Sequence, residues 1–266
     1  MFKAKKKFGQ NFLKDEAILS QIIQAIPKNR HIVEIGAGLG DLTQRLLSIG
    51  RVRAYEIDSD LIPILRSRCT DELSSGVLTL INADILDSWQ GRNLLDCEYD
   101  MVANLPYYVA TNIVLKALGD ENCKSLTVMV QREVAHKFCA QSGVSEFGAI
   151  SVLSGLNATA RVLFDVPPSA FEPAPKVTSS VMQICKTAPL ISQNGERGVF
   201  ANFSEYEDFA RFLRTCFGSP RKTLARNLAQ IWTKEQIEAK FSALNLPRTI
   251  RPHELDVALF LEIYRG

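Results

Sequence analysis

The chain has 266 residues, of which 46% are hydrophobic and 23% charged, enough for one substantial apolar core and a smaller second domain. Lysine and arginine total 31 against 29 aspartate and glutamate, and so mild an excess does not by itself indicate a nucleic-acid or membrane partner. No run approaches the ~20 apolar residues of a membrane span, and the first residues lack the apolar centre of a signal peptide. The six cysteines are scattered and the three histidines lie far apart, which argues against disulfides and a metal centre. We therefore expect a reduced, cytoplasmic protein.

The opening segment, residues 3–13, places four lysines ahead of two aromatic residues and two side-chain amides. A helix is expected to follow, because Asp15 can cap it and Ile18 and Ile22 share one face. Pro27 ends that helix. The lysines can face solvent or bind the phosphates of a nucleic acid, and the sequence leaves both interpretations open.

A strand–glycine–helix unit comes next. Residues 31–35 form an apolar strand that runs into Gly36-Ala-Gly-Leu-Gly40, after which Asp41 or Thr43 opens a helix. Such a unit is the first turn of an open α/β sheet, in which ligands bind beyond the carboxyl ends of the strands. The second strand places Glu56 twenty positions after Gly36, and an acidic residue there usually accepts hydrogen bonds from ribose hydroxyls.

The spacing of the glycines distinguishes between cofactors. A dinucleotide fold uses G-x-G-x-x-G so that a pyrophosphate can lie on the helix N-terminus, but here Gly40 comes one position early and Asp41 occupies the expected place. A carboxylate there would repel a pyrophosphate. S-adenosylmethionine has no phosphate and carries a sulfonium cation, so Glu34, Asp41 and Asp84 are compatible with it. The sequence favours this methyl donor over NAD, and the simplest alternative is a glycine turn without a ligand.

A second motif follows a buried strand over residues 99–103. It reads Asn104-Leu105-Pro106-Tyr107-Tyr108. Pro106 fixes its own φ and holds Leu105 extended, so the Leu105 carbonyl and the Asn104 side-chain oxygen can point into one pocket. Two acceptors beside a flat aromatic ring suit the exocyclic amine of an adenine. The alternative is a strand end with a turn and two packing tyrosines.

The remaining elements complete the sheet. We expect strands at 77–81, 126–130, 161–166 and 177–184, and helices at 110–118, 132–140 and from Phe147. The last two strands flank a proline-rich loop and suggest an antiparallel pair at the sheet edge. That loop holds Phe171 on a restrained backbone, and the alternative is a rigid linker in which Phe171 is buried.

The composition shifts at about Thr187, where residues 192–198 read as a linker. Only helical patterns follow, with apolar stripes at Phe209, Phe212, Leu213 and Phe217, at Leu224, Leu228 and Ile231, and at Leu255, Leu259 and Ile263. Basic residues gather here with few acids between them: Arg211, Arg214, Arg221, Lys222 and Arg226. They indicate either a solvated face or a phosphate-binding surface. We therefore expect a catalytic domain over 1–187 and a small helical RNA-binding domain over 188–266.

Six motifs in order resemble those of the ribosomal RNA adenine dimethyltransferases. They are Phe8-Gly-Gln-Asn-Phe-Leu13, Glu34-Ile-Gly-Ala-Gly-Leu-Gly40, Glu56-Ile-Asp58, Ala83-Asp84, Asn104-Leu-Pro-Tyr107 and Phe171-Glu-Pro-Ala-Pro-Lys-Val-Thr-Ser179. The resemblance continues through Arg221-Lys-Thr-Leu and Arg251-Pro-His-Glu-Leu to the end of the chain. It is greatest with the bacterial KsgA type, which dimethylates two adjacent adenosines near the 3′ end of 16S rRNA.

This resemblance implies a Rossmann-like α/β methyltransferase sheet, mostly parallel with an antiparallel strand at one edge, and a small all-helical C-terminal domain. It implies that S-adenosylmethionine is held by Asn11, Leu13, Gly36, Gly38, Glu56, Asp84 and Asn104. It assigns the catalytic motif to Asn104, Leu105, Pro106 and Tyr107, with Tyr107 and Phe171 enclosing the target adenine. Ala37 stands where many relatives have proline, and Tyr108 where some have asparagine, which leaves the role of Tyr108 open.

The resemblance also implies a partner, 16S rRNA within an assembling small ribosomal subunit, and release of S-adenosylhomocysteine by a monomer that needs neither metal nor membrane. Two alternatives remain. A related 23S rRNA adenine methyltransferase associated with macrolide resistance shares the glycine turn, although Leu105 and the Arg221 stretch favour the 16S type. The chain could instead act chiefly as a binding factor in ribosome assembly, against which the intact Gly36, Glu56 and Asn104 argue.

Overall fold

The structure, a computed structural model, describes residues 4–27, 31–193 and 195–266. It divides the chain into two compact units, the first Met1–Ala135 with Ala160–Lys186 and the second His136–Thr159 with Thr187–Gly266. The division expected from sequence, a single cut after residue 187, therefore differs in the segment 136–159. That segment joins the helical unit because its apolar residues Phe147 and Val152 belong to the core of that unit.

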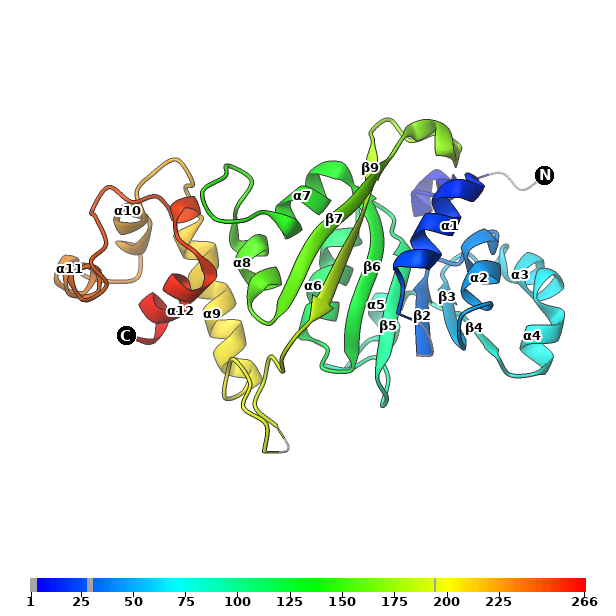
Figure 1. Cartoon of the computed structure of the whole chain (residues 1–266), viewed down its shortest axis with the longest axis horizontal. Helices are drawn as coiled ribbons and strands as arrows, with labels where there is room; N and C mark the ends of the chain where they lie inside the picture. The colour runs from blue at the N-terminus through cyan, green and yellow to red at the C-terminus, as the bar shows by residue number, and fades with distance from the viewer. Residues whose placement is uncertain (1–3, 28–30, 194) are drawn as a thin grey trace. The chain divides into compact units, whose positions relative to one another are not determined.

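The first unit is built on a seven-stranded sheet (Figure 1). Its strands, in spatial order, are β4 (Leu78–Asn82), β3 (Val52–Glu56), β2 (His31–Ile35), β5 (Tyr99–Asn104), β6 (Cys123–Gln131), β9 (Ser179–Lys186) and β7 (Ala158–Val166). The strands from β4 to β6 are parallel to their neighbours, whereas β9 runs antiparallel to β6. This arrangement confirms the predicted mostly parallel, Rossmann-like sheet with antiparallel pairing toward one edge.

Helices cover the faces of this sheet. They are α1 (Glu16–Ala25), α2 (Asp41–Leu46), α3 (Ile62–Arg68), α4 (Thr70–Ser74), α5 (Ile85–Ser88) and α6 (Ala110–Gly119). Helix α7 (Arg132–Cys139) directly follows β6 in the chain and includes the boundary between the two units. In Figure 1, α1 and α2 lie in front of the strands and α6 lies behind them. Covered on both sides, the central strands are buried along most of their length, and every residue of β5 except the last is buried. Asp15 caps α1 as predicted, accepting from the backbone nitrogens of Ala17 and Ile18.

The strand order places three segments that the sequence singled out at one edge of the sheet. Strand β2 lies between β3 and β5, and the parallel register pairs Glu34 with Ala54 on one side and with Val102 on the other. The chain leaves β2 for β3 in one direction and returns to β5 in the other, so the order reverses beside β2. Ligands of open α/β sheets bind at such a reversal, beyond the carboxyl ends of the strands. The glycine turn, Glu56 and Asn104 all lie there.

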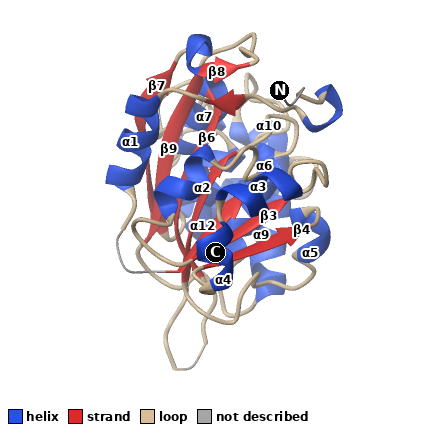
Figure 2. Ribbon diagram, turned by 90° about the vertical axis from the view of Figure 1, so that its right-hand side faces the viewer, coloured by secondary structure: helices blue, strands red, loops and turns tan. Residues whose placement is uncertain are grey.

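A second, two-stranded sheet joins the start of the chain to the proline-rich loop, and Figure 2 shows its strand β8 in red. Strand β1 (Phe12–Leu13) pairs antiparallel with β8 (Phe171–Glu172), in a register that sets Leu13 opposite Phe171. Two short 3-10 helices precede these strands, η1 (Lys6–Phe8) and η2 (Pro168–Ala170). The pairing fixes residues 12–13 against a segment about 160 positions later in the chain.

The second unit is helical apart from isolated bridges near residues 191–200. Its elements are α8 (Ala149–Gly155), α9 (Phe203–Cys216), α10 (Leu224–Leu228), α11 (Lys234–Ala243), η3 (Pro252–Glu254) and α12 (Val257–Arg265). The predicted apolar stripes form its core, except that Ile231 is 48% exposed. That prediction was wrong because α10 ends at Leu228, so the helical period does not reach Ile231. Among the described helices of the chain, none combines the length and apolarity that crossing a bilayer requires.

Candidate active site

A pocket opens at the carboxyl ends of β2, β3 and β5. Its walls come from three parts of the chain: the N-terminal strap, which we define as residues 5–13, the glycine turn with the end of β3, and the Asn104 motif. The lining residues are Phe8, Gly9, Gln10, Asn11, Phe12, Gly36, Gly38, Glu56, Ile57, Leu61, Asn104, Leu105, Pro106 and Tyr107. The structure thus brings together eight of the residues singled out from the sequence, namely Asn11, Gly36, Gly38, Glu56, Asn104, Leu105, Pro106 and Tyr107.

The glycine turn requires glycine for two reasons, its backbone conformation and its close contact with the strap. Gly36, Gly38 and Gly40 all have positive φ, at 76°, 60° and 89°, a region that side chains with a Cβ rarely adopt. A Cβ on Gly38 would also lie 3.2 Å from Cδ1 of Phe12, in the strap. The turn therefore brings bare backbone to the wall of the pocket and lets the strap lie close against it.

Glu56 is held by two backbone nitrogens. Its Oε2 accepts from the Gly38 nitrogen and its Oε1 from the Asp58 nitrogen, each at 2.8 Å. The side chain is buried, and burial raises the pKa of Glu56 although these hydrogen bonds oppose the rise. Each carboxylate oxygen keeps a second lone pair, which suits it to accept from two neighbouring hydroxyl groups.

Asn104 is anchored through its nitrogen. Its Nδ2 donates to the backbone carbonyl of Asn11 at 2.9 Å, which determines which way the amide faces. Among the contacts of the described residues, none occupies the Asn104 side-chain oxygen. The next residue, Leu105, is fixed by its own nitrogen, which donates to the Met129 carbonyl at 3.1 Å, and by its fully buried side chain.

Two tyrosines follow Pro106 and lie in different environments. Tyr107 is half-buried and its hydroxyl shares a 2.7 Å hydrogen bond with the Ser179 hydroxyl on β9, so its ring is held at the pocket wall. Burial also raises the pKa of Tyr107. Tyr108 is 66% exposed, and a Cβ on Gly9 would lie 3.5 Å from its ring. The second aromatic therefore lies beside the strap with most of its surface open to solvent.

Three of the expected site residues do not line this pocket. Leu13 and Phe171 face each other across the β1–β8 pairing, and both are buried in the core of the first unit, 5% and 6% exposed. Asp84 caps α5 by accepting from the Leu86 nitrogen at 2.9 Å. The Ala83 nitrogen donates to the Glu56 carbonyl, so Asp84 starts its helix next to the pocket.

The acids that were predicted to suit a sulfonium differ in their surroundings. Asp41 is paired with Lys14 and Arg68, at 2.5 and 3.0 Å, so much of its charge is neutralised within the chain. It is the first residue of α2, as predicted, and Gly40 is the N-cap. Glu34 is 1% exposed and neither of its oxygens has a hydrogen-bond partner among the described residues. Burial, with the nearby Glu56 carboxylate, raises its pKa to about 8.

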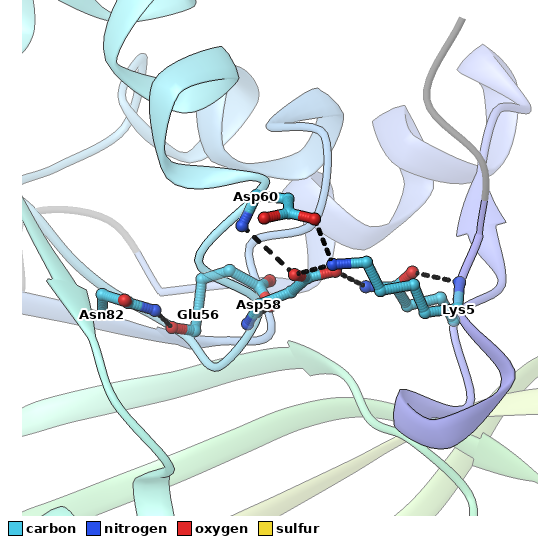
Figure 3. Close-up of polar contacts among 6 residues, drawn as sticks. Lys5, Glu56, Asp58, Asp60 and Asn82 are labelled. Atoms are coloured by element: carbon cyan, nitrogen blue, oxygen red, sulfur yellow. Dashed lines mark hydrogen bonds and ion pairs between the residues drawn. The ribbon is translucent and has the colours of Figure 1, made fainter.

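Sequence reasoning did not place Lys5, Gln10 or Asp58 at this site. Figure 3 shows Lys5, Asp58 and Asp60 pointing toward one another, with Glu56 and Asn82 beyond them. The Asn82 side chain donates to the Glu56 carbonyl at 2.8 Å. The motif Glu56-Ile-Asp58 was visible in the sequence, but nothing local indicated that its aspartate meets the strap. The described part of the chain contains no group of three or more metal-binding side chains.

Comparisons with known proteins agree with one another. The model of the family described as "Ribosomal RNA adenine dimethylase" matches residues 1–265. A "Ribosomal RNA small subunit methyltransferase A" from Campylobacter curvus is 50% identical, covering 100% of this chain and 93% of its own. A protein of the same name from Aliarcobacter butzleri is 46% identical, covering 98% of this chain and 95% of its own.

Solved structures share the fold. A dimethyladenosine transferase from Plasmodium falciparum is similar with a TM-score of 0.75 and 23% identity, covering 94% of this chain and 95% of its own. The 23S rRNA methyltransferase ErmE is similar with a TM-score of 0.71 and 20% identity, covering 96% and 98%. Since the family model spans almost every residue and the sequence relatives cover the whole chain, this protein belongs to the ribosomal RNA adenine dimethylase family.

Proposed function

We propose that the chain transfers methyl groups from S-adenosylmethionine to the exocyclic amines of two adjacent adenosines near the 3′ end of 16S rRNA, within an assembling small ribosomal subunit. Membership of the adenine dimethylase family supports the reaction, and the names of the sequence relatives support the small subunit as substrate. The observation that carries the proposal is the anchored amide of Asn104, whose oxygen is left to accept beside the Tyr107 ring.

The pocket fits the cofactor by the chemistry of its walls. Glu56 has lone pairs for the two ribose hydroxyls, and the bare backbone at Gly36 and Gly38 allows close approach of the methionine part. Asn11 lines the same pocket, whereas Leu13 would act from behind it and Asp84 from its edge, toward the adenine amine. When bound, S-adenosylmethionine supplies an electrophilic methyl group on sulfur and leaves as S-adenosylhomocysteine. The protein is expected to act as a monomer in the cytoplasm.

Two hydrogen-bond acceptors in the Asn104 motif can make the target amine a better nucleophile. The lone pair of adenine's exocyclic amine is delocalised into the ring, which makes this nitrogen a poor nucleophile. The Asn104 oxygen and the Leu105 carbonyl can accept its two N–H groups, which favours a pyramidal nitrogen with its lone pair directed at the cofactor pocket. Alignment of this kind supplies ~7–11 kcal/mol in favourable cases. A strong base is not required, because the alkylated amine is acidic and loses its proton afterwards.

The aromatic residues give the target base a stacking surface. A paired base cannot reach the pocket, so the adenosine has to be unpaired or flipped out. Stacking on Tyr107 contributes about 1–3 kcal/mol toward holding it there. The predicted second stacking partner, Phe171, is buried against Leu13, and its role stays a prediction. Pro106 sets the backbone that presents Leu105 and Tyr107 together.

A second candidate is methylation of 23S rRNA. The similarity to ErmE concerns the fold alone, whereas relatives at 46–50% identity carry the name of a small-subunit methyltransferase. Labelled S-adenosylmethionine with unmethylated small subunits, followed by mass mapping, should locate label on two adjacent adenosines near the 3′ end of 16S RNA. Label confined to 23S RNA in a parallel reaction would establish the second candidate.

A role chiefly in assembly is distinguished by a different experiment. A variant without methyl transfer that still restores subunit assembly in cells would show that binding is the main duty. We expect such a variant to restore it incompletely, since the pocket retains the acceptors and the ribose-binding carboxylate that methyl transfer needs.

A further inference from the structure

The first residue of the N-terminal strap makes a close ionic contact with the loop that follows β3. The Lys5 ammonium donates to Oδ1 of Asp58 at 2.6 Å and to Oδ2 of Asp60 at 2.5 Å (Figure 3). Both aspartates lie in the loop after β3, directly beyond Glu56. The contact joins residues more than 50 positions apart, so it ties the strap to the loop and is not part of any local turn.

A second side chain of the strap, that of Gln10, also hydrogen-bonds to Asp58. Gln10 Nε2 donates to Oδ2 of Asp58 at 2.8 Å, while Gln10 Oε1 accepts from the Lys5 backbone nitrogen at 2.7 Å. The Asp58 side chain is 1% exposed, and its two oxygens accept from two side chains of the strap. Burial raises the pKa of Asp58, but the hydrogen bonds from Lys5, Gln10 and the Asp60 backbone nitrogen, together with the charge of Lys5, outweigh burial and hold that pKa below its usual value.

Asp58 also touches the carboxylate assigned to the cofactor. Its backbone nitrogen donates to Oε1 of Glu56, whose other oxygen accepts from Gly38. A continuous series of hydrogen bonds therefore runs from Lys5 through Asp58 to Glu56 and the glycine turn. The far end of the strap is held separately, by the β1–β8 pairing and by a hydrogen bond from the Lys14 nitrogen to the Ala170 carbonyl.

We propose that Lys5 is a positioning residue for the cofactor: by pairing with Asp58 and Asp60 it latches the N-terminal strap over the pocket and sets how tightly the cofactor is retained. The identity of that cofactor rests on the proposed function. Lys5 does not line the pocket, so it acts through Asp58 and through the strap residues Phe8 to Asn11 that do. Because β1 is anchored independently, loss of the latch loosens the cofactor more than it disturbs Asn104.

This assignment separates Lys5 from the lysines beside it. Lys6 and Lys7 are exposed, whereas the Lys5 side chain is 29% exposed and faces two carboxylates. The sequence grouped all of them as solvent-facing or phosphate-binding, and the structure gives Lys5 a different partner. Lys6→Met therefore serves as a matched control, since this substitution removes one positive charge from the same segment without changing the contacts of Lys5 with Asp58 and Asp60.

The test uses the full chain and S-adenosylhomocysteine in titration calorimetry, with S-adenosylmethionine in steady-state assays. Lys5→Met should raise the Kd for S-adenosylhomocysteine and the KM for S-adenosylmethionine about tenfold, as expected for loss of a hydrogen-bonded charge from a buried carboxylate. Its kcat at saturating cofactor should stay within about twofold of the parent. Lys5→Arg should restore most of the affinity, and Lys6→Met should leave it unchanged.

Salt gives an independent measurement. The parent's affinity for S-adenosylhomocysteine should weaken as salt screens the partly exposed pair, and that dependence should largely disappear in Lys5→Met. Unchanged affinity and salt dependence in Lys5→Met, or an equal effect of Lys6→Met, would overturn the latch. If the parent itself failed to bind S-adenosylhomocysteine, the proposed function would fail and not merely the latch.

Discussion

The side-chain nitrogen of Asn104 lies 2.9 Å from the backbone carbonyl of Asn11, a residue 93 positions earlier in the chain. The strap thus determines which atom of the amide is left to accept, since a flipped amide would place two oxygens against each other. Asn11 lies next to β1, so the orientation of the Asn104 amide depends on the end of the strap that the β1–β8 pairing holds, and not on the Lys5 end.

Replacing Asn104 should stop catalysis without unfolding the protein. We expect Asn104→Ala to lower single-turnover methyl transfer at least a hundredfold, because one of two acceptors for the amine is lost, while the melting temperature and RNA affinity stay close to the parent's. Asn104→Asp keeps the size but cannot donate to the Asn11 carbonyl, so it should be equally inactive. A normal rate in the alanine variant would remove the acceptor role.

Gly38→Ala tests how closely the strap lies on the glycine turn. The new methyl group would lie 3.2 Å from the Phe12 ring, and alanine would be strained at the φ of 60° that this position requires. We therefore expect destabilisation above ~1 kcal/mol and weaker cofactor binding. Gly76 is the matched control, with φ of 72° and nothing within 4 Å of the added carbon. Urea unfolding of Gly38→Ala and Gly76→Ala should show the larger loss at Gly38, and equal losses would exclude a contribution from Phe12.

Glu34 should make stability depend on pH. Its pKa is about 8 in the folded chain and near 4.5 when unfolded, so between these values the folded state binds more protons. The contribution of Glu34 to the free energy of unfolding is therefore greatest below pH ~4.5. It falls as the pH rises toward 8, by up to about 1.4 kcal/mol per pH unit. Glu34→Gln should gain on the parent steadily from pH 5 to pH 8 in urea unfolding. A constant difference between the two proteins would show that Glu34 is ionised throughout.

The Tyr107–Ser179 hydrogen bond should help to fix the stacking ring. Tyr107→Phe and Ser179→Ala should each slow methyl transfer only about two- to tenfold, in line with ~0.5–1.5 kcal/mol for a neutral hydrogen bond. The double variant should be no worse than either single one. Tyr107→Ala removes the ring itself and should be far slower. Additive losses in the double variant would mean that the two hydroxyls act separately.

Charge reversal in the helical unit should affect RNA and not the cofactor. Arg221 and Lys222 are both exposed, so Arg221→Glu with Lys222→Glu is expected to leave the fold intact. RNA affinity should fall, and the slope of its logarithm against the logarithm of salt concentration should decrease by the equivalent of about two phosphate contacts. The Kd for S-adenosylhomocysteine should stay unchanged. Equal loss of both affinities in parallel titrations would indicate misfolding instead.

Local patterns were enough to predict the sheet and half of the pocket. The glycine turn, Glu56 and the Asn104 motif each follow a recognisable strand, and parallel strands bring their carboxyl ends to one edge. The contacts of Lys5 with Asp58 and of Leu13 with Phe171 join distant segments, and no periodicity encodes them. The same limit explains Phe147, which packs with residues from later in the chain. Ile231 was mispredicted for a local reason, because α10 ends at Leu228.

The pairing of Leu13 with Phe171 has a consequence for biosynthesis. A nascent polypeptide that has not yet extended past Glu172 lacks the strand that pairs with Phe12 and Leu13, so the β1 end of the strap has nowhere to dock. The binding cleft is therefore finished last, although most of its walls are translated early. Truncated products should be unable to sequester the methyl donor.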